Sequence, residues 1–172
     1  DIGAFSLRER LELKQFAFAN PHQHAEFGYR LLKTMTPLSE VAVMVRFHHV
    51  NWNRGQGEQL LGEAVPLESH ILHLADRIAS LIDCDQTILS QVPTIVKAIE
   101  SVQEEMFHPQ LVEYFRKLSD REYFWLDLTS NSIHYILKRK LVFEPLALEN
   151  LHEIARLFSH IIDFRSPFTA TH

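Results

Sequence analysis

The stretch "VPLESHILHLADRIASLID", residues 65–83, constrains the fold more than any other part of the chain. Its apolar residues recur at spacings of three and four, the repeat of an α-helix with one buried face. Pro66 suits the first turn of such a helix, where its missing N–H leaves no bond unmade. The predicted buried stripe consists of Leu67, Ile71, Leu74, Ile78, Leu81 and Ile82.

The same spacing recurs along most of the chain, in segments 24–35, 38–50, 92–103, 108–120, 130–140 and 149–164. In the second segment Ser39 is the expected N-cap, and one stripe holds Val41, Met44, Val45 and His48. Because no segment shows a convincing alternating pattern, the predicted fold class is all-α, a bundle of about eight helices. No internal repeat of 20 to 50 residues is visible.

Composition limits the class of protein. A chain of 172 residues with 46% hydrophobic content suits one domain, or one domain and part of another. Its net charge of −5 gives no field for gripping nucleic acid, so nucleic acid is not an expected partner. A single cysteine, Cys84, and the lack of a membrane span or signal peptide predict a cytoplasmic protein without a membrane partner.

Residues 49–65 interrupt the helical pattern. This segment holds Gly55, Gly57 and Gly62 and few apolar residues. It is predicted to be a loop of well over ten residues, and such loops in compact domains are usually functional or disordered.

Several of the 11 histidines are clustered, and the pair His48–His49 leads directly into this loop. Neighbours in a helix point about 100° apart, so both reach one ion only where the helix ends. The alternative is one core histidine and one exposed histidine. His24 lies four residues before Gly28, which lets another helix come close. The alternative for His24 is an ordinary polar residue at a helix start.

Asp76 lies near the apolar face of the helix predicted within residues 65–83. A carboxylate there must be paired or bound to a cation, so a metal ligand and a salt bridge are both open. The order Asp1, His24, His48–His49, Asp76 combines carboxylate and imidazole donors. Such donors suit iron, manganese or zinc, and two such ions make a hydroxide nucleophile at neutral pH.

These residues resemble the HD superfamily of metal-dependent phosphohydrolases, most closely its HD-GYP branch of bacterial signalling phosphodiesterases. The opening "DIGAF" resembles the segment after the histidine of the family's His-Asp pair, and "HAEFGYRLL" resembles the next motif. Residues 48–76 resemble the signature from the double histidine to a metal-binding aspartate. "MFHPQLVEYF" resembles a segment that usually reads Phe-Asp-Pro. The resemblance covers about residues 1–120.

The resemblance implies an HD-domain helical bundle, a divalent transition-metal centre (Fe, Mn or Zn) of two ions in the intact protein, and hydrolysis of phosphodiesters. The expected substrate is cyclic di-guanylate (cyclic di-GMP) or another phosphoester. By position, Asp1 would bridge metals, and the implied ligands are His24, His48, His49 and Asp76.

The chain departs from the family pattern where substrate recognition is expected. Val50 replaces a glutamate, Ala4 replaces a lysine thought to assist phosphate binding, and Asn53-Arg54 replaces an acid-Gly pair. Where Gly-Tyr-Pro is expected, the chain reads Gln-Gly-Glu. The expected substrate-loop residues are therefore Asn53, Arg54, Gln56, Gly57 and Glu58.

The expected domain organisation is an HD-GYP-like domain over residues 1–128 that lacks its N-terminal helices, followed by a helical linker over 129–172. The tail "FSHIIDFRSPFTATH" resembles the start of a second HD domain, with His172 as its first ligand. The alternative is a helix with a frayed end. A ligand-bearing segment would precede Asp1, so this fragment alone is expected to be impaired as an enzyme.

Three functions compete. The first is a divergent phosphodiesterase. The second is a catalytically degenerate regulatory or dimerisation module, whose partners would be a second HD domain or another copy of the chain. For that module, residues 123–125 ("YFW") are either a partner surface or part of the core. The third, a haemerythrin-like carrier, requires histidines and carboxylates repeated over four long helices, which a single loop-linked double histidine does not offer.

Overall fold

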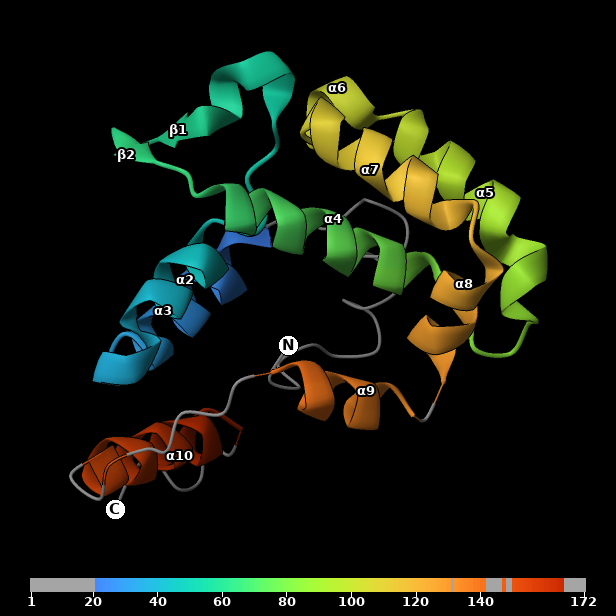
Figure 1. Ribbon diagram of the computed structural model, residues 1–172. Helices are drawn as coiled ribbons and strands as arrows, with labels where there is room; N and C mark the ends of the chain where they lie inside the picture. The colour runs from blue at the N-terminus through green and yellow to red at the C-terminus, as the bar shows by residue number, and fades with distance from the viewer. Residues whose placement is uncertain (1–20, 131, 142–146, 148–149, 166–172) are drawn as a thin grey trace. The chain divides into compact units, whose positions relative to one another are not determined.

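The computed structural model describes residues 21–130, 132–141, 147 and 150–165, and in these residues the all-α prediction is confirmed (Figure 1). One two-stranded antiparallel hairpin accompanies the helices. In chain order the elements are α2 (Pro21–Leu32), the 3₁₀ helix η1 (Thr36–Leu38), α3 (Ser39–Arg46), the 3₁₀ helix η2 (Asn53–Glu58), β1 (Gln59–Leu60), β2 (Glu63–Ala64), α4 (Leu67–Leu81), α5 (Ile88–Glu100), α6 (Gln103–Met106), α7 (Pro109–Ser119), α8 (Glu122–Thr129), α9 (Ile133–Lys140) and α10 (Leu151–Arg165).

The chain divides into two compact units. Of the described residues, the first unit comprises 21–49, 65–72, 147 and 150–165, and the second comprises 50–64, 73–130 and 132–141. Helix α4 begins in the first unit and ends in the second. This division describes packing, and the expected domain boundary at residue 128 stays a prediction. Every helix in the described part of the chain is too short or too polar to span a bilayer.

In the first unit, α2 and α3 form a tight helical hairpin (Figure 1). A Cβ added at Gly28 would lie 2.9 Å from Cγ1 of Val45, so the glycine permits the close approach that the sequence predicted. The start of α3 differs from the prediction, because its N-cap is Leu38. Ser39 is already helical, and its hydroxyl donates to the carbonyl of Thr36 (2.9 Å). The buried position of α3 is Ala42, whereas the predicted Val41 is exposed.

Helix α10 is joined to this hairpin in the first unit. The carboxylate of Glu153 accepts from the backbone N–H of Thr36 (3.1 Å) and from its hydroxyl (3.3 Å). These bonds satisfy the start of η1, where no side-chain cap is present.

The second unit has its own apolar core, built from α4, α5, α7 and α8 with the residues between them. Trp125 is fully buried, and its indole N–H donates to the carbonyl of Ser119 (3.0 Å). The "YFW" segment is thus divided: Trp125 is core, Phe124 packs partly buried against it, and Tyr123 is exposed. The buried hydrophobic residues are Leu74, Ile78, Ile88, Ile95, Ile99, Phe107, Val112, Phe115 and Trp125.

The buried face of α4 differs from the predicted stripe in its first half. Leu74 and Ile78 are buried as expected, but Leu67 and Ile71 are 50% and 47% exposed. The buried positions in that half are instead polar, namely Ser69, His70 and His73, and Arg77 continues the polar stripe one turn farther along. Within the first unit, the Ser69 hydroxyl donates a hydrogen bond to the carbonyl of Met44 on α3 (3.0 Å).

Candidate metal centre

Three histidine side chains converge in the first unit, where the end of α3 meets α2. His24 comes from α2, and His48 and His49 follow the last residue of α3. Nε2 of His24 lies 3.3 Å from Nε2 of His48 and 2.8 Å from Nε2 of His49. The three residues can place one ring nitrogen each within 4.8 Å of the others. We call these residues the histidine triad.

The end of α3 explains how adjacent histidines reach one point. The helix ends at Arg46, and Phe47 already leaves helical geometry at φ −102° and ψ 5°. The rings of His48 and His49 are therefore not held 100° apart, and their centroids lie only 4.0 Å from each other. The expectation that a double histidine converges at a helix end agrees with this geometry.

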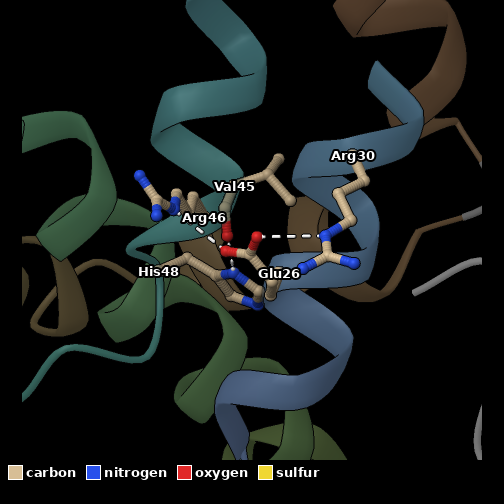
Figure 2. Close-up of polar contacts among 5 residues, drawn as sticks. All are labelled: Glu26, Arg30, Val45, Arg46 and His48. Carbon is tan, nitrogen blue, oxygen red and sulfur yellow. Dashed lines mark hydrogen bonds and ion pairs between the residues drawn. The ribbon is translucent and has the colours of Figure 1, made fainter. Parts of the chain in front are cut away.

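The proton on His48 is placed by its backbone contact. Nδ1 of His48 lies 2.5 Å from the carbonyl oxygen of Val45, as Figure 2 shows. A carbonyl oxygen only accepts, so Nδ1 carries the proton and the neutral ring keeps a lone pair on Nε2. Fixing a ligating histidine through its other nitrogen is the usual outer-shell arrangement of metal sites.

The geometry fits a metal ion. Nitrogens bound tetrahedrally at about 2.0–2.1 Å lie about 3.3 Å apart, and neighbouring octahedral positions lie about 3.0 Å apart. The measured separations of 2.8 and 3.3 Å bracket these values. A shared proton can satisfy one pair of nitrogens, whereas one cation accepts all three lone pairs. His49 is 5% exposed and the other two rings are half-buried, so the site is sheltered but reachable from water. The histidine triad could therefore hold a divalent metal ion.

The two predicted carboxylate ligands are not placed with the triad. Asp1 lies outside the described residues. Asp76 is half-buried on the part of α4 that belongs to the second unit, beside Arg77. Burial lowers the pKa of the Arg77 guanidinium from its usual value, and the Asp76 carboxylate acts in the opposite direction. The role of both aspartates as ligands stays a prediction, as does the effect of Ala4, which also lies outside the described residues.

The predicted substrate loop lies in the second unit. The side-chain amides of Asn53 and Gln56 are joined (2.8 Å), and Arg54 and Glu58 are exposed. The backbone at Asn53 and Arg54 has positive φ values of 44° and 54°, which non-glycine residues adopt at a cost. This segment is an ordered turn followed by the β1–β2 hairpin.

Gly57 and Trp52 hold the loop in this shape. A Cβ at Gly57 would lie 2.1 Å from the carbonyl oxygen of Asn51, so the loop requires glycine there. Its N–H donates to the carbonyl of Trp52 (2.8 Å), and the N–H of Trp52 donates to Met106 (3.1 Å). The Trp52 ring also lies against His108, with centroids 4.2 Å apart.

Sequence reasoning missed two polar groupings. The first is the buried polar stripe of α4, whose spacing at residues 69, 70, 73 and 77 is a readable helical signal. The second is an ion pair between Glu26 and Arg46, which are twenty positions apart, so no local pattern announces it.

Replacing Gly28 by alanine is expected to separate α2 from α3, because the new methyl group meets the stiff, β-branched Val45 at 2.9 Å. We expect a loss of about 1–3 kcal/mol in the free energy of unfolding and weaker metal binding. Urea unfolding and metal titration measure the two effects. Adding Val45→Ala removes the obstacle and should restore affinity. A Gly28→Ala chain as stable as the wild type would contradict the close approach.

One family of known proteins matches the part of the chain that carries this centre. The HD domain family matches residues 1–81, which include the histidine triad and Asp76. The 3'3'-cGAMP-specific phosphodiesterase 1 of Vibrio cholerae serotype O1 is 24% identical over 166 residues, 89% of this chain and 38% of the relative. The chain thus spans under two fifths of that relative's length. No solved structure matched the chain. The first 81 residues, just under half of the chain, are therefore similar to HD domains.

Proposed function

We propose that this chain is a member of the HD superfamily and carries the metal centre of a metal-dependent phosphodiesterase that acts on cyclic dinucleotides. The observation that carries the proposal is the convergence of three Nε2 atoms, with the His48 proton held on Nδ1 by Val45. The HD domain match and the named activity of the Vibrio cholerae relative support it.

In this mechanism the residues of the chain hold the metal ion and orient its ligands. A bound divalent ion lowers the pKa of a coordinated water and polarises a phosphoryl oxygen. His24, His48 and His49 would hold that ion, and the Val45 carbonyl keeps the His48 ring in its binding tautomer. Asp76 and Asp1 are proposed as further residues that would hold metal. Iron, manganese and zinc all suit such mixed donors.

Residues 53–58 are proposed to contact the substrate. Arg54 is exposed on the loop, and a guanidinium is suited to a phosphate oxygen. The Asn53 and Gln56 amides offer the donors and acceptors that base edges require. Because the loop lacks Gly-Tyr-Pro, we propose cyclic dinucleotides as the substrate class rather than cyclic di-guanylate alone. Cyclic di-guanylate and 3'3'-cGAMP are the two substrates to compare.

The test is hydrolysis by the chain within its parent protein, which we propose to be a tandem-HD protein, after loading with Fe²⁺, Mn²⁺ or Zn²⁺. We expect at least one ion per chain and metal-dependent opening of one of the two cyclic dinucleotides. Fewer than one bound ion per chain would sink the enzymatic proposal.

A second candidate is a regulatory or dimerisation module that keeps the fold without turnover. The changes at Val50 and in the Gln56–Glu58 segment favour it, because substrate recognition is expected there. Metal-loaded protein that binds ions but opens neither dinucleotide would support this candidate, and measurable turnover would exclude it.

A further inference from the structure

A single carboxylate joins two arginines beside the histidine triad. Oε2 of Glu26 lies 3.0 Å from Nε of Arg46, and Oε1 lies 3.2 Å from Nε of Arg30, as Figure 2 shows. Arg30 is four residues from Glu26 on the same helix, whereas Arg46 belongs to α3. Of these two ion pairs, only the one with Arg46 therefore connects α2 to α3.

The two ion pairs differ in their surroundings. The Arg46 side chain is 23% exposed, and its guanidinium carbon lies 4.7 Å from the ring centroid of Tyr29 on α2. The Arg30 side chain is 72% exposed. Arg46 thus contacts α2 through an ion pair and a cation–π contact, while Arg30 makes an exposed pair of little energetic value.

Glu26 is the shared partner of both arginines. Partial burial raises the pKa of this carboxyl, but the hydrogen bonds and charges of Arg46 and Arg30 outweigh it, so the pKa is lowered overall.

The pair lies close to the ligands along both helices. Glu26 follows His24 by two residues, a rise of about 3 Å along α2. Arg46 precedes His48 by two residues, at the end of α3. The Val45 that holds the His48 ring also packs against Gly28. Any slip of α2 along α3 therefore moves His24 relative to His48 and His49.

We propose that Arg46 is a positioning residue of the metal centre. By pairing with Glu26 and stacking on Tyr29, it sets the register of α2 against α3 that brings His24 to the two histidines at the end of α3. This inference rests on the proposed metal centre, but it does not depend on the phosphodiester reaction.

The experiment is a metal titration of the full, metal-free chain with Co²⁺ and with Zn²⁺. Loss of a ligand's own hydrogen-bond partner typically weakens metal binding by about 10- to 100-fold. Because Arg46 acts on the ligands through the packing of α2 against α3, we expect Arg46→Gln to weaken binding by about 10-fold and to alter the visible spectrum of bound Co²⁺. Arg46→Lys keeps the positive charge but lacks the planar guanidinium, so its metal affinity should lie between those of the wild type and Arg46→Gln. Arg30→Gln is the matched control, since it removes the ion pair within α2, and its dissociation constant should match the wild type.

Wild-type affinity in Arg46→Gln, or equal weakening by Arg30→Gln, would overturn the proposal. Should Arg46→Gln fail to fold, Glu26→Gln tests the same pair from the other side against the same control. If the chain shows the expected pattern but its metal-loaded parent protein hydrolyses no dinucleotide, the phosphodiesterase is refuted and the inference stays intact. A wild-type chain that binds no metal overturns both.

Discussion

His49→Ala is expected to abolish tight metal binding and, with it, hydrolysis of any phosphodiester. His49 is the most buried member of the triad, and its Nε2 lies 2.8 Å from that of His24. Removing a ligand costs more than removing an outer-shell partner, so affinity should fall by more than about 100-fold. Metal content after dialysis and turnover of both cyclic dinucleotides measure the two effects.

The matched control is His22→Ala. His22 lies on α2 two residues before His24, but its side chain is exposed and it is outside the triad. This variant should bind metal and turn over substrate like the wild type. If His49→Ala retained a full complement of metal, the triad would not be the centre. If both variants lost metal equally, ligation by His49 would not explain the loss.

The part of the centre that the sequence predicts is the part governed by local geometry. A double histidine can converge only where a helix ends, and α3 ends at Arg46. A glycine four residues after His24 indicates a close helix, and Gly28 does face Val45. The fold class follows in the same way, because the three-and-four spacing of apolar residues is a local property of each helix.

The remainder depends on partners distant in sequence. The spacing in α4 is compatible with an apolar stripe through Leu67 and Ile71 and also with a polar stripe through His70 and His73, and the structure buries the polar one. Burying a polar group is costly unless it forms hydrogen bonds. Its partners can lie far away in the sequence, as the Met44 carbonyl does for the Ser69 hydroxyl. Periodicity cannot supply that information.

In the substrate loop, too, some features follow from the local sequence and others do not. Its length and glycines predicted a loop that is either functional or disordered, but not the β1–β2 hairpin or the turn that precedes it. In the sequence, Gln-Gly-Glu at residues 56–58 stands where the family pattern has Gly-Tyr-Pro. The structure gives Gly57 a steric role of its own, since its missing side chain makes room for the Asn51 carbonyl. A departure from a family motif is therefore no measure of how constrained a residue is.

Gly57→Ala is accordingly expected to separate substrate recognition from metal binding. The new Cβ would lie 2.1 Å from the Asn51 oxygen and 3.0 Å from the Cα of Trp52, and both are backbone atoms. A rotamer change cannot relieve this overlap, so the turn must open and break the bond from the Gly57 N–H to the Trp52 carbonyl. Displacing positioning groups by about 1 Å can cost about 100-fold in rate, which is the loss we expect for cyclic dinucleotide hydrolysis.

Metal content should stay at the wild-type value in this variant, because the triad belongs to the first unit and Gly57 to the second. Gly62→Ala is the matched control in the same loop: its φ of +82° carries a strain of order 1 kcal/mol, but a Cβ there meets nothing within 4 Å. It should therefore retain most of the turnover. Equal rates for Gly57→Ala and the wild type would show that residues 53–58 do not hold the substrate, and loss of metal from Gly57→Ala would show that the loop also supports the centre.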